Sequence, residues 1–292
     1  MACVMELRDQ EIYVLKGKKS RGNIKVSHAF RIRLFEPLFI NNEINLNESL
    51  ISFVYDKLQK ENIKDRKVHL VVNHRSILSK DFLIPKTDRK KQAFIVDNEM
   101  TALFNLTKEF VVDYRILDEV EYEGVKQSHC LASAIRKSTI EGLEIFFEGL
   151  DRKIISIESS SNSFLNFVST FQFNNHAEPS IFIDASTSYI RFYIFNGDDF
   201  MMMRSLHIHV EDEYNLVSKR VLHLIELLDQ SQSSITHKRV NQVYLVGFER
   251  RLNWMQQLIK DNFELDIILP KFNVIVDKEL DIRDFGNSLG VF

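Results

Sequence analysis

The sequence predicts an α/β protein of two lobes, with a smaller α+β subdomain inserted into the first lobe. Three observations indicate this architecture. Residues 179–204 have the pattern of two strands and a third that returns after an Asn-Gly-Asp turn. Residues 68–157 follow the order β-β-α-β-β-α-β, which is enough for a subdomain with its own core. Residues 211–230 form a long helical pattern with one apolar stripe, as a helix packed on a sheet does.

Length, charge and cysteine content limit the class of protein. The chain has 292 residues, more than the ~100–200 of a usual single domain. Its net charge of −3 argues against a surface for nucleic acid. No run of about 18 apolar residues, as a membrane-spanning helix requires, is present. Cys3 and Cys130 form neither a metal motif nor a disulfide framework. We therefore expect a cytoplasmic protein without a nucleic-acid partner.

The expected boundaries follow from the changes in pattern along the chain. Residues 1–66 and 158–178 are assigned to the first lobe, residues 67–157 to the inserted subdomain, and residues 179–292 to the second lobe. No linker rich in proline, glycine or serine separates these parts, so we expect them to pack together.

The first lobe is expected to open with a hairpin and a helix. Strands are predicted over 11–16 and 24–34, the second from its alternation of apolar and polar residues. Asn45 or Asn47 is expected to cap the helix that follows. Its apolar face comprises Leu50, Ile51, Val54 and Leu58.

The inserted subdomain is predicted to contain two helices among its strands. Thr87 is expected to cap a helix that extends to about residue 105. Ser138 and Glu141 fit a capping box at the start of the second helix. The strands are predicted over 68–72, 77–84, 110–117, 128–135 and 154–157.

The second lobe is expected to alternate strands and helices. Besides the hairpin over 179–204 and the helix over 211–230, the predicted elements are a strand over 243–246, a helix over 250–262, a strand over 265–269 and a final helix after Asp284. A further helix over 163–170 is predicted to lead into this lobe.

The hairpin over 179–204 carries the strongest functional pattern. A strand ends at Asp184, small residues including Ser186 and Thr187 follow, and a second strand pairs straight back. This is the layout of a phosphate-binding hairpin in the actin and sugar-kinase fold. Small residues let backbone amides approach a phosphate closely, and the acid holds a metal ion or its waters. The alternative is an ordinary hairpin in which Asp184 caps a turn.

The order of elements and several strings resemble the PilM proteins of type IV pilus assembly, which are relatives of the actin-like division protein FtsA. VHLVVNHRSILSKDFLIP is similar to the first hairpin of that family's inserted subdomain, and VVDYRILDE to its next strand. IFIDASTSYIRFYIFNGDDFMMMRSL is similar to the second phosphate hairpin. VNQVYLVGFERRLNWMQQLIKDNFELDIILP resembles the strand, loop and helix on the adenosine side, and FGNSLGVF the final helix.

The resemblance implies an actin-like, ribonuclease H-type fold and a binding function. PilM proteins hold the N-terminal cytoplasmic peptide of an inner-membrane protein, PilN, between the core and the inserted subdomain. A PilN-like peptide is therefore the expected partner, a pilus motor ATPase is a second, and the protein is expected at the inner face of the membrane through its partners. The implied role is that of a scaffold.

The sequence departs from the family where a nucleotide would bind. The first hairpin, MELRDQEIYV, has no glycine before Gly17, and Ala185 stands where the second hairpin usually has a glycine. Gly247 is followed by the bulky Phe248 and the acidic Glu249. We therefore expect a degenerate nucleotide site around Asp184, Ser186, Thr187 and Gly247, with no cofactor; ATP with magnesium is the alternative.

Other interpretations remain open at this stage. The main one is an ATP-binding, actin-like ATPase of pilus, type II secretion or cell division machinery, with Asp184 on the metal. A filament-forming actin and a module of an unrelated pathway are two more. His207 and His209 share one strand face but lack further metal ligands, and Met201 to Met203 are expected to pack in the core. No arrangement for covalent catalysis is visible, so no catalytic residue is predicted.

Overall fold

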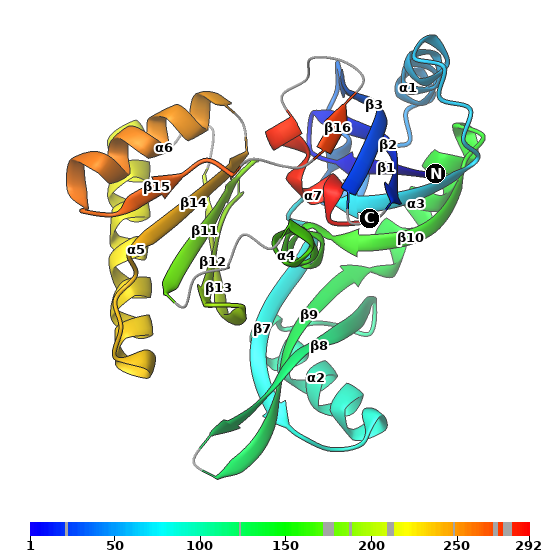
Figure 1. The fold of residues 1–292 in the computed structure, drawn as a ribbon. Coiled ribbons are helices and arrows are strands. Elements are labelled where there is room, and N and C mark those ends of the chain that lie inside the picture. Colours follow the sequence, from blue (N-terminus) through cyan, green and yellow to red (C-terminus); the bar gives the residue numbers. More distant parts are fainter. Residues whose placement is uncertain are drawn as a thin grey trace. The chain divides into compact units, whose positions relative to one another are not determined.

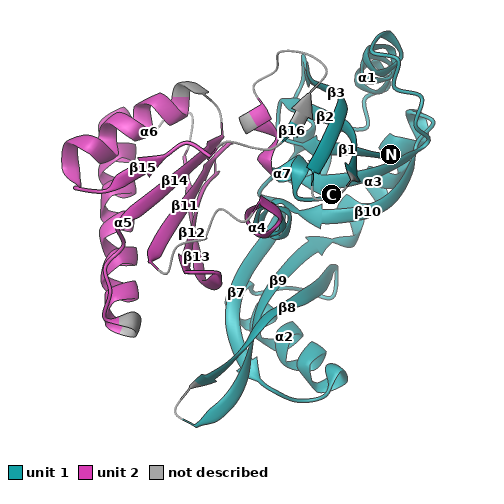
Figure 2. Cartoon of the chain, in the orientation of Figure 1, with its two compact units in different colours: residues 1–167, 274–280, 287–292 teal, residues 168–273, 281–286 magenta. Residues whose placement is uncertain are grey.

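The fold was analysed in a computed structural model of the chain. It describes residues 1–20, 23–122, 124–171, 178–186, 189–208, 213–247, 249–270, 274–276 and 282–292. The elements are shown in Figure 1. The chain forms two compact units, which Figure 2 distinguishes by colour. Unit 1 comprises residues 1–167, 274–280 and 287–292, and unit 2 comprises residues 168–273 and 281–286.

Unit 1 is built around a six-stranded sheet with the order β10-β6-β1-β2-β3-β16. Its strands β1, β2 and β3 follow one another in an antiparallel meander, whereas β6 and β10 run parallel to β1. The strands are β1 (Ala2–Leu7), β2 (Glu11–Ser20), β3 (Asn23–Arg33), β6 (Lys67–Val72), β10 (Lys153–Ser159) and β16 (Val274–Val276). A short hairpin, β4 (Phe39–Ile40) and β5 (Glu43–Ile44), follows β3.

The two faces of this sheet are covered by different helices. Cys3, Met5 and Leu7 of β1 belong to one core with α1 (Glu48–Lys60) and α3 (Lys137–Gly149). Successive residues of a strand point to opposite faces, so Glu6 faces the other way. On that face the Glu6 carboxylate accepts hydrogen bonds from residues of α7 (Gly286–Leu289). The residue after α7, Gly290, packs on α4 (Ser160–Phe171). The lack of a side chain at Gly290 makes this packing possible, because a Cβ there would lie 1.8 Å from the Ser163 carbonyl oxygen.

The inserted subdomain is a three-stranded antiparallel sheet with one helix. The order is β7-β9-β8, with β7 (Ile77–Pro85), β8 (Phe110–Tyr122) and β9 (Val125–Arg136). Helix α2 (Arg89–Phe104) packs on one face. The core between them contains Ile84, Val96, Met100, Cys130, Ala132 and Ala134.

The domain boundaries differ from the expected ones at several points. The expected insertion, residues 67–157, includes β6 and β10, which are strands of the main sheet, and α3, which packs in the main core. The separate sheet and its helix span only residues 77–136. The expected second lobe, residues 179–292, also loses residues 274–280 and 287–292 to unit 1, because β16 pairs with β3 and α7 bonds to Glu6.

Unit 2 contains a five-stranded sheet with the order β13-β12-β11-β14-β15. The strands are β11 (Pro179–Ala185), β12 (Tyr189–Asn196), β13 (Asp199–His207), β14 (Gln242–Gly247) and β15 (Asp266–Ile268). Helices α5 (Tyr214–Thr236) and α6 (Glu249–Asn262) share its core, and a 3-10 helix, η1 (Ile282–Phe285), contacts β14. The predicted hairpin is confirmed, and Gly197 in its turn has a φ of 61°.

Each unit contains the same order of strands. In unit 1 the order is β3-β2-β1-β6-β10, and in unit 2 it is β13-β12-β11-β14-β15. In both, an antiparallel meander of three strands is followed by two strands parallel to the first. This arrangement confirms the predicted α/β class and shows an internal duplication that the sequence did not reveal as a repeat.

The predicted helix caps are confirmed in one case and wrong in two. Asn47 caps α1, since its Oδ1 accepts from the Ser49 amide at 2.8 Å. Asp88, and not Thr87, caps α2 by accepting from two amides of its first turn. The capping box at Ser138 does not form, because α3 already begins at Lys137 and the Ser138 hydroxyl donates to Glu43 instead.

Candidate functional site

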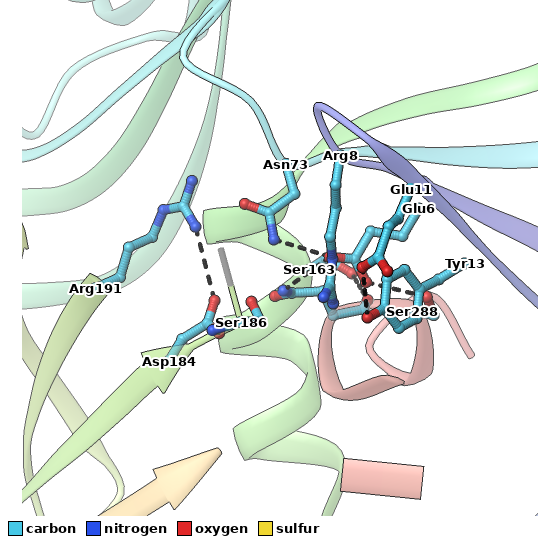
Figure 3. Close-up of polar contacts among 11 residues, drawn as sticks. Glu6, Arg8, Glu11, Tyr13, Asn73, Ser163, Asp184, Ser186, Arg191 and Ser288 are labelled. Carbon is cyan, nitrogen blue, oxygen red and sulfur yellow. Dashed lines mark hydrogen bonds and ion pairs between the residues drawn. The ribbon is translucent and has the colours of Figure 1, made fainter. Parts of the chain in front are cut away.

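The hairpin of unit 2 places Asp184 at the end of a fully buried strand. Its side chain is 1 % exposed, and its Oδ1 accepts a hydrogen bond from the Ser186 amide at 3.0 Å. Arg191 lies directly opposite on β12, with its Nη1 3.7 Å from Asp184 Oδ2. Figure 3 shows these side chains. The carboxylate is therefore held by a neighbouring amide and by a buried arginine of the same hairpin.

Gly247 ends β14 directly beside the end of β11. It pairs with Ala185 and has a φ of +132°, which residues with a side chain rarely adopt. A Cβ at this position would lie 2.7 Å from the Ala185 carbonyl carbon and 2.8 Å from the Ser186 nitrogen. The glycine is needed here because two segments of backbone approach each other closely.

The structure thus brings together three of the four predicted site residues. Asp184, Ser186 and Gly247 lie at the carboxyl ends of the adjacent parallel strands β11 and β14. In α/β sheets this edge is where ligands bind. Thr187 lies outside the described residues, as does Phe248.

A second polar cluster, at the first hairpin, was not predicted. Glu6 on β1 is completely buried and forms an ion pair with Arg8, whose Nε lies 2.8 Å from Glu6 Oε1. Asn73, the residue after β6, also donates to Oε1, at 2.8 Å. Asn287 and Ser288 of α7 donate to Oε1 and Oε2, both at 3.3 Å. In Figure 3 the side chains of Arg8, Asn73 and Ser288 converge on the Glu6 carboxylate.

Arg8 is fixed by a further contact with the hairpin. Its guanidinium lies 3.7 Å from the centre of the Tyr13 ring, and Tyr13 is the cross-strand partner of Glu6. The Arg8 amide donates to the Glu11 carbonyl at 3.0 Å and so closes the turn between β1 and β2. The signal that would have revealed Glu6 is its place near the end of the first meander strand, which corresponds to Asp184 in unit 2.

A polar seam joins the inserted sheet to α4 within unit 1. The Ser133 hydroxyl of β9 donates to the Ser159 hydroxyl at 3.0 Å, and Arg115 of β8 donates to Asn162 at 3.3 Å. Beside this seam, burial raises the pKa of the Glu158 carboxyl, although a hydrogen bond from Asn162 opposes this shift.

The remaining candidates from the sequence have structural roles in unit 2. The His207 ring lies against Tyr189, with 4.5 Å between the ring centres, and His209 lies outside the described residues. Met201 and Met202 pack against the core, and Met203 is buried. Across the described part of the chain, no group of three or more His, Cys, Asp or Glu side chains is placed to hold a metal ion.

Comparison with known proteins identifies the fold. The sequence matches no protein-family model, and no curated protein sequence matches it. Solved structures are similar to this chain, among them the following two. The first is the PilM-PilN type IV pilus biogenesis complex, with a TM-score of 0.78 and 14 % identity over 99 % of this chain and 96 % of the other. The second is a Bacteroides thetaiotaomicron protein with an actin-like ATPase fold and unknown function, with a TM-score of 0.54 and 13 % identity over 100 % and 95 %.

The chain therefore has the actin-like fold. Both similarities extend over nearly the full length of both chains, so the fold includes both units and the inserted subdomain. At these identities the comparison establishes the fold alone. Among the helices that the structure describes, none is both long enough and apolar enough to cross a lipid bilayer.

Proposed function

We propose that this protein is a cytoplasmic scaffold of type IV pilus assembly that binds the N-terminal cytoplasmic peptide of an inner-membrane, PilN-like protein. Through this partner it associates with the inner face of the membrane, and a pilus motor ATPase is a second partner. In this proposal its nucleotide site is degenerate, and it acts by binding its partners. The similarity in fold to a protein solved in a PilM-PilN complex supports this proposal.

The observation that carries the proposal is the second face of the inserted sheet. Helix α2 covers the face that carries Cys130 and Ala132. On the other face the strands align Asp81, Leu131 and Arg115 in one row and Leu83, His129 and Asp118 in the next. At one end of this face, Arg115 and Ser133 contact the α4 region. Toward the hairpin tip, Leu83 and Val125 are 46 % and 55 % exposed.

This face and its edges fit an extended peptide. Among the described strands, β7 and β8 each pair only with β9, so each presents one edge with backbone groups for an added strand. The accessible part of this face lies toward the hairpin tip, at Leu83, because Asp81, Leu131 and His129 are buried. His129 lies between two carboxylates, 3.6 Å from Asp81 and 3.5 Å from Asp118. A peptide with alternating apolar and polar side chains would pair with one of these edges and place an apolar side chain near Leu83.

The experiment is calorimetric titration of the full chain with synthetic N-terminal peptides from candidate membrane partners. We expect saturable binding that ATP and magnesium do not change. Leu83→Asp should weaken binding at least about tenfold, because it places a charge on the apolar part of the face. Leu103→Asp is the matched control, since Leu103 lies on α2 and is 55 % exposed. Absence of peptide binding, or equal loss in both variants, would contradict the proposal.

A further inference from the structure

We infer that Arg8 and Arg191 are resident cations, each of which neutralises the acid of one hairpin, so that neither hairpin fits magnesium-ATP. The actin-like fold implies this ligand, and its metal and phosphates need free carboxylate oxygens and free backbone amides. The inference deepens the degenerate-site part of the proposed function.

In unit 1 the acid is bonded by groups of the protein itself, with three donors on Glu6 Oε1 and the Ser288 hydroxyl on Oε2. Glu6 is fully buried, and every hydrogen bond to its oxygens comes from an N–H or O–H donor of the protein. A cation bound to this carboxylate would have to displace Arg8, which is 5 % exposed and also lies over the Tyr13 ring. Removing one partner of such a buried pair leaves an uncompensated charge, which is strongly unfavourable.

The turn of the same hairpin does not fit a phosphate. The Arg8 amide is already bonded to the Glu11 carbonyl, so it is not available to an anion. Asp9 adds a carboxyl group to the turn, and burial raises its pKa although Arg75 opposes this shift. A phosphate requires a turn of bare amides without a neighbouring acid, and glycine usually provides that turn.

In unit 2 the acid is also paired with an arginine, which comes from the neighbouring strand. Arg191 stands opposite Asp184 in the strand register, and both side chains are buried. The Ser186 amide, which would face a phosphate, donates to Asp184 Oδ1. Gly247 pairs with Ala185 of the neighbouring strand, and a Cβ at Gly247 would lie 2.8 Å from the Ser186 nitrogen, so backbone lies close beside this amide.

The two arginines occupy unrelated positions. Arg8 follows its acid by two residues on the same chain segment, whereas Arg191 reaches Asp184 from the neighbouring strand. One such pair in a single hairpin is an ordinary structural ion pair. Two pairs, formed at the corresponding strand ends of two sheets with the same order, indicate that the chain itself balances the charge of both acids.

The test combines ligand titration with two variants of the full chain. Thermal unfolding by circular dichroism is measured with and without millimolar ATP and magnesium, and a fluorescent ATP analogue is titrated in parallel. A micromolar site would raise the Tm by about 5 °C or more under these conditions. We expect no such shift and no saturable binding for the unmodified protein.

Arg8→Ala and Arg191→Ala should each lower the Tm by about 6–15 °C, because each leaves a buried carboxylate without its counter-charge. Arg66→Ala is the control, since Arg66 pairs with Asp151 but both side chains are largely exposed, 80 % and 67 %. We expect a change of less than about 2 °C for this variant. If an alanine variant fails to fold, Arg8→Lys and Arg191→Lys, which keep the charge, should fold.

Two results would overturn the inference. One is micromolar binding of ATP by the unmodified protein, because the paired acids and bonded amides would then not exclude the nucleotide. The other is a Tm for both alanine variants equal to that of Arg66→Ala. Peptide titration of the same unmodified protein separates this inference from the scaffold proposal, since loss of peptide binding affects only the latter.

Discussion

Substitution of Gly247 by alanine tests whether this residue serves the contact between two strands. The φ of +132° is unfavourable for alanine and costs about 1–3 kcal/mol. The new Cβ would also lie 2.7 Å from the Ala185 carbonyl carbon, whereas ordinary contacts begin at 3.4 Å. The backbones of β11 and β14 must therefore separate by roughly 0.7 Å, and overpacking of this kind costs about 1–3 kcal/mol. We expect a total loss of about 2–6 kcal/mol.

Urea unfolding followed by tryptophan fluorescence is a suitable assay. The chain has a single tryptophan, Trp254, and it packs against the core of unit 2, where Gly247 lies. Gly197→Ala is the control in the same unit, because Gly197 also has a positive φ but lies in a turn. It should cost only about 1–2 kcal/mol. Equal unfolding midpoints for the two variants would refute the argument that close backbone contact requires Gly247.

Three further predictions concern unit 1. Gly290→Ala should destabilise unit 1 by more than about 3 kcal/mol, measured by urea unfolding with circular dichroism, because its Cβ would lie 1.8 Å from a carbonyl oxygen of α4; a midpoint equal to that of the unmodified protein would contradict this contact. Glu158→Gln should raise the free energy of unfolding at pH 7, because burial raises the pKa of Glu158 and so disfavours its charged form in the folded protein. This advantage over the unmodified protein should disappear as the pH falls below the usual carboxyl range, where Glu158 is protonated. A difference between the two proteins that stays the same across a pH series of unfolding curves would contradict the prediction. Cys3 and Cys130 should react with a thiol reagent at pH 8 only after unfolding, because burial raises the pKa of both thiols to about 12, and rapid labelling of the folded protein would count against it.

Local patterns predicted most of the strands and helices. The hairpin of unit 2 was recognisable because alternating apolar residues enclose the Asn196-Gly197 turn, and both signals depend on the hairpin alone. Asn47 was recognisable as a cap for the same reason, since its bond to the Ser49 amide is made within the helix start.

Patterns that depend on distant residues misled the sequence analysis. Ser138 has the right spacing for a capping box, but Glu43, which is far away in the sequence, accepts its hydroxyl hydrogen bond in the folded chain. The strand β6 was assigned to the insertion as the first strand of the pattern over 68–157 and because its sequence resembles the first hairpin of the PilM insertion. Its actual partners, β1 and β10, are set by long-range pairing that no local window contains.

The two strand-end acids show why one part of the candidate site was found and the other missed. Asp184 was recognised because small residues follow it, a pattern that predicts a phosphate hairpin. Glu6 occupies the corresponding place in unit 1, but Arg8 follows it, so the same pattern is broken. Arg8, which breaks the sequence pattern after Glu6, is also the group that balances the charge of Glu6 in the folded protein. The two hairpins therefore lack the glycines of a phosphate loop, and each has an arginine paired with its acid instead: Arg8 in unit 1 and Arg191 in unit 2.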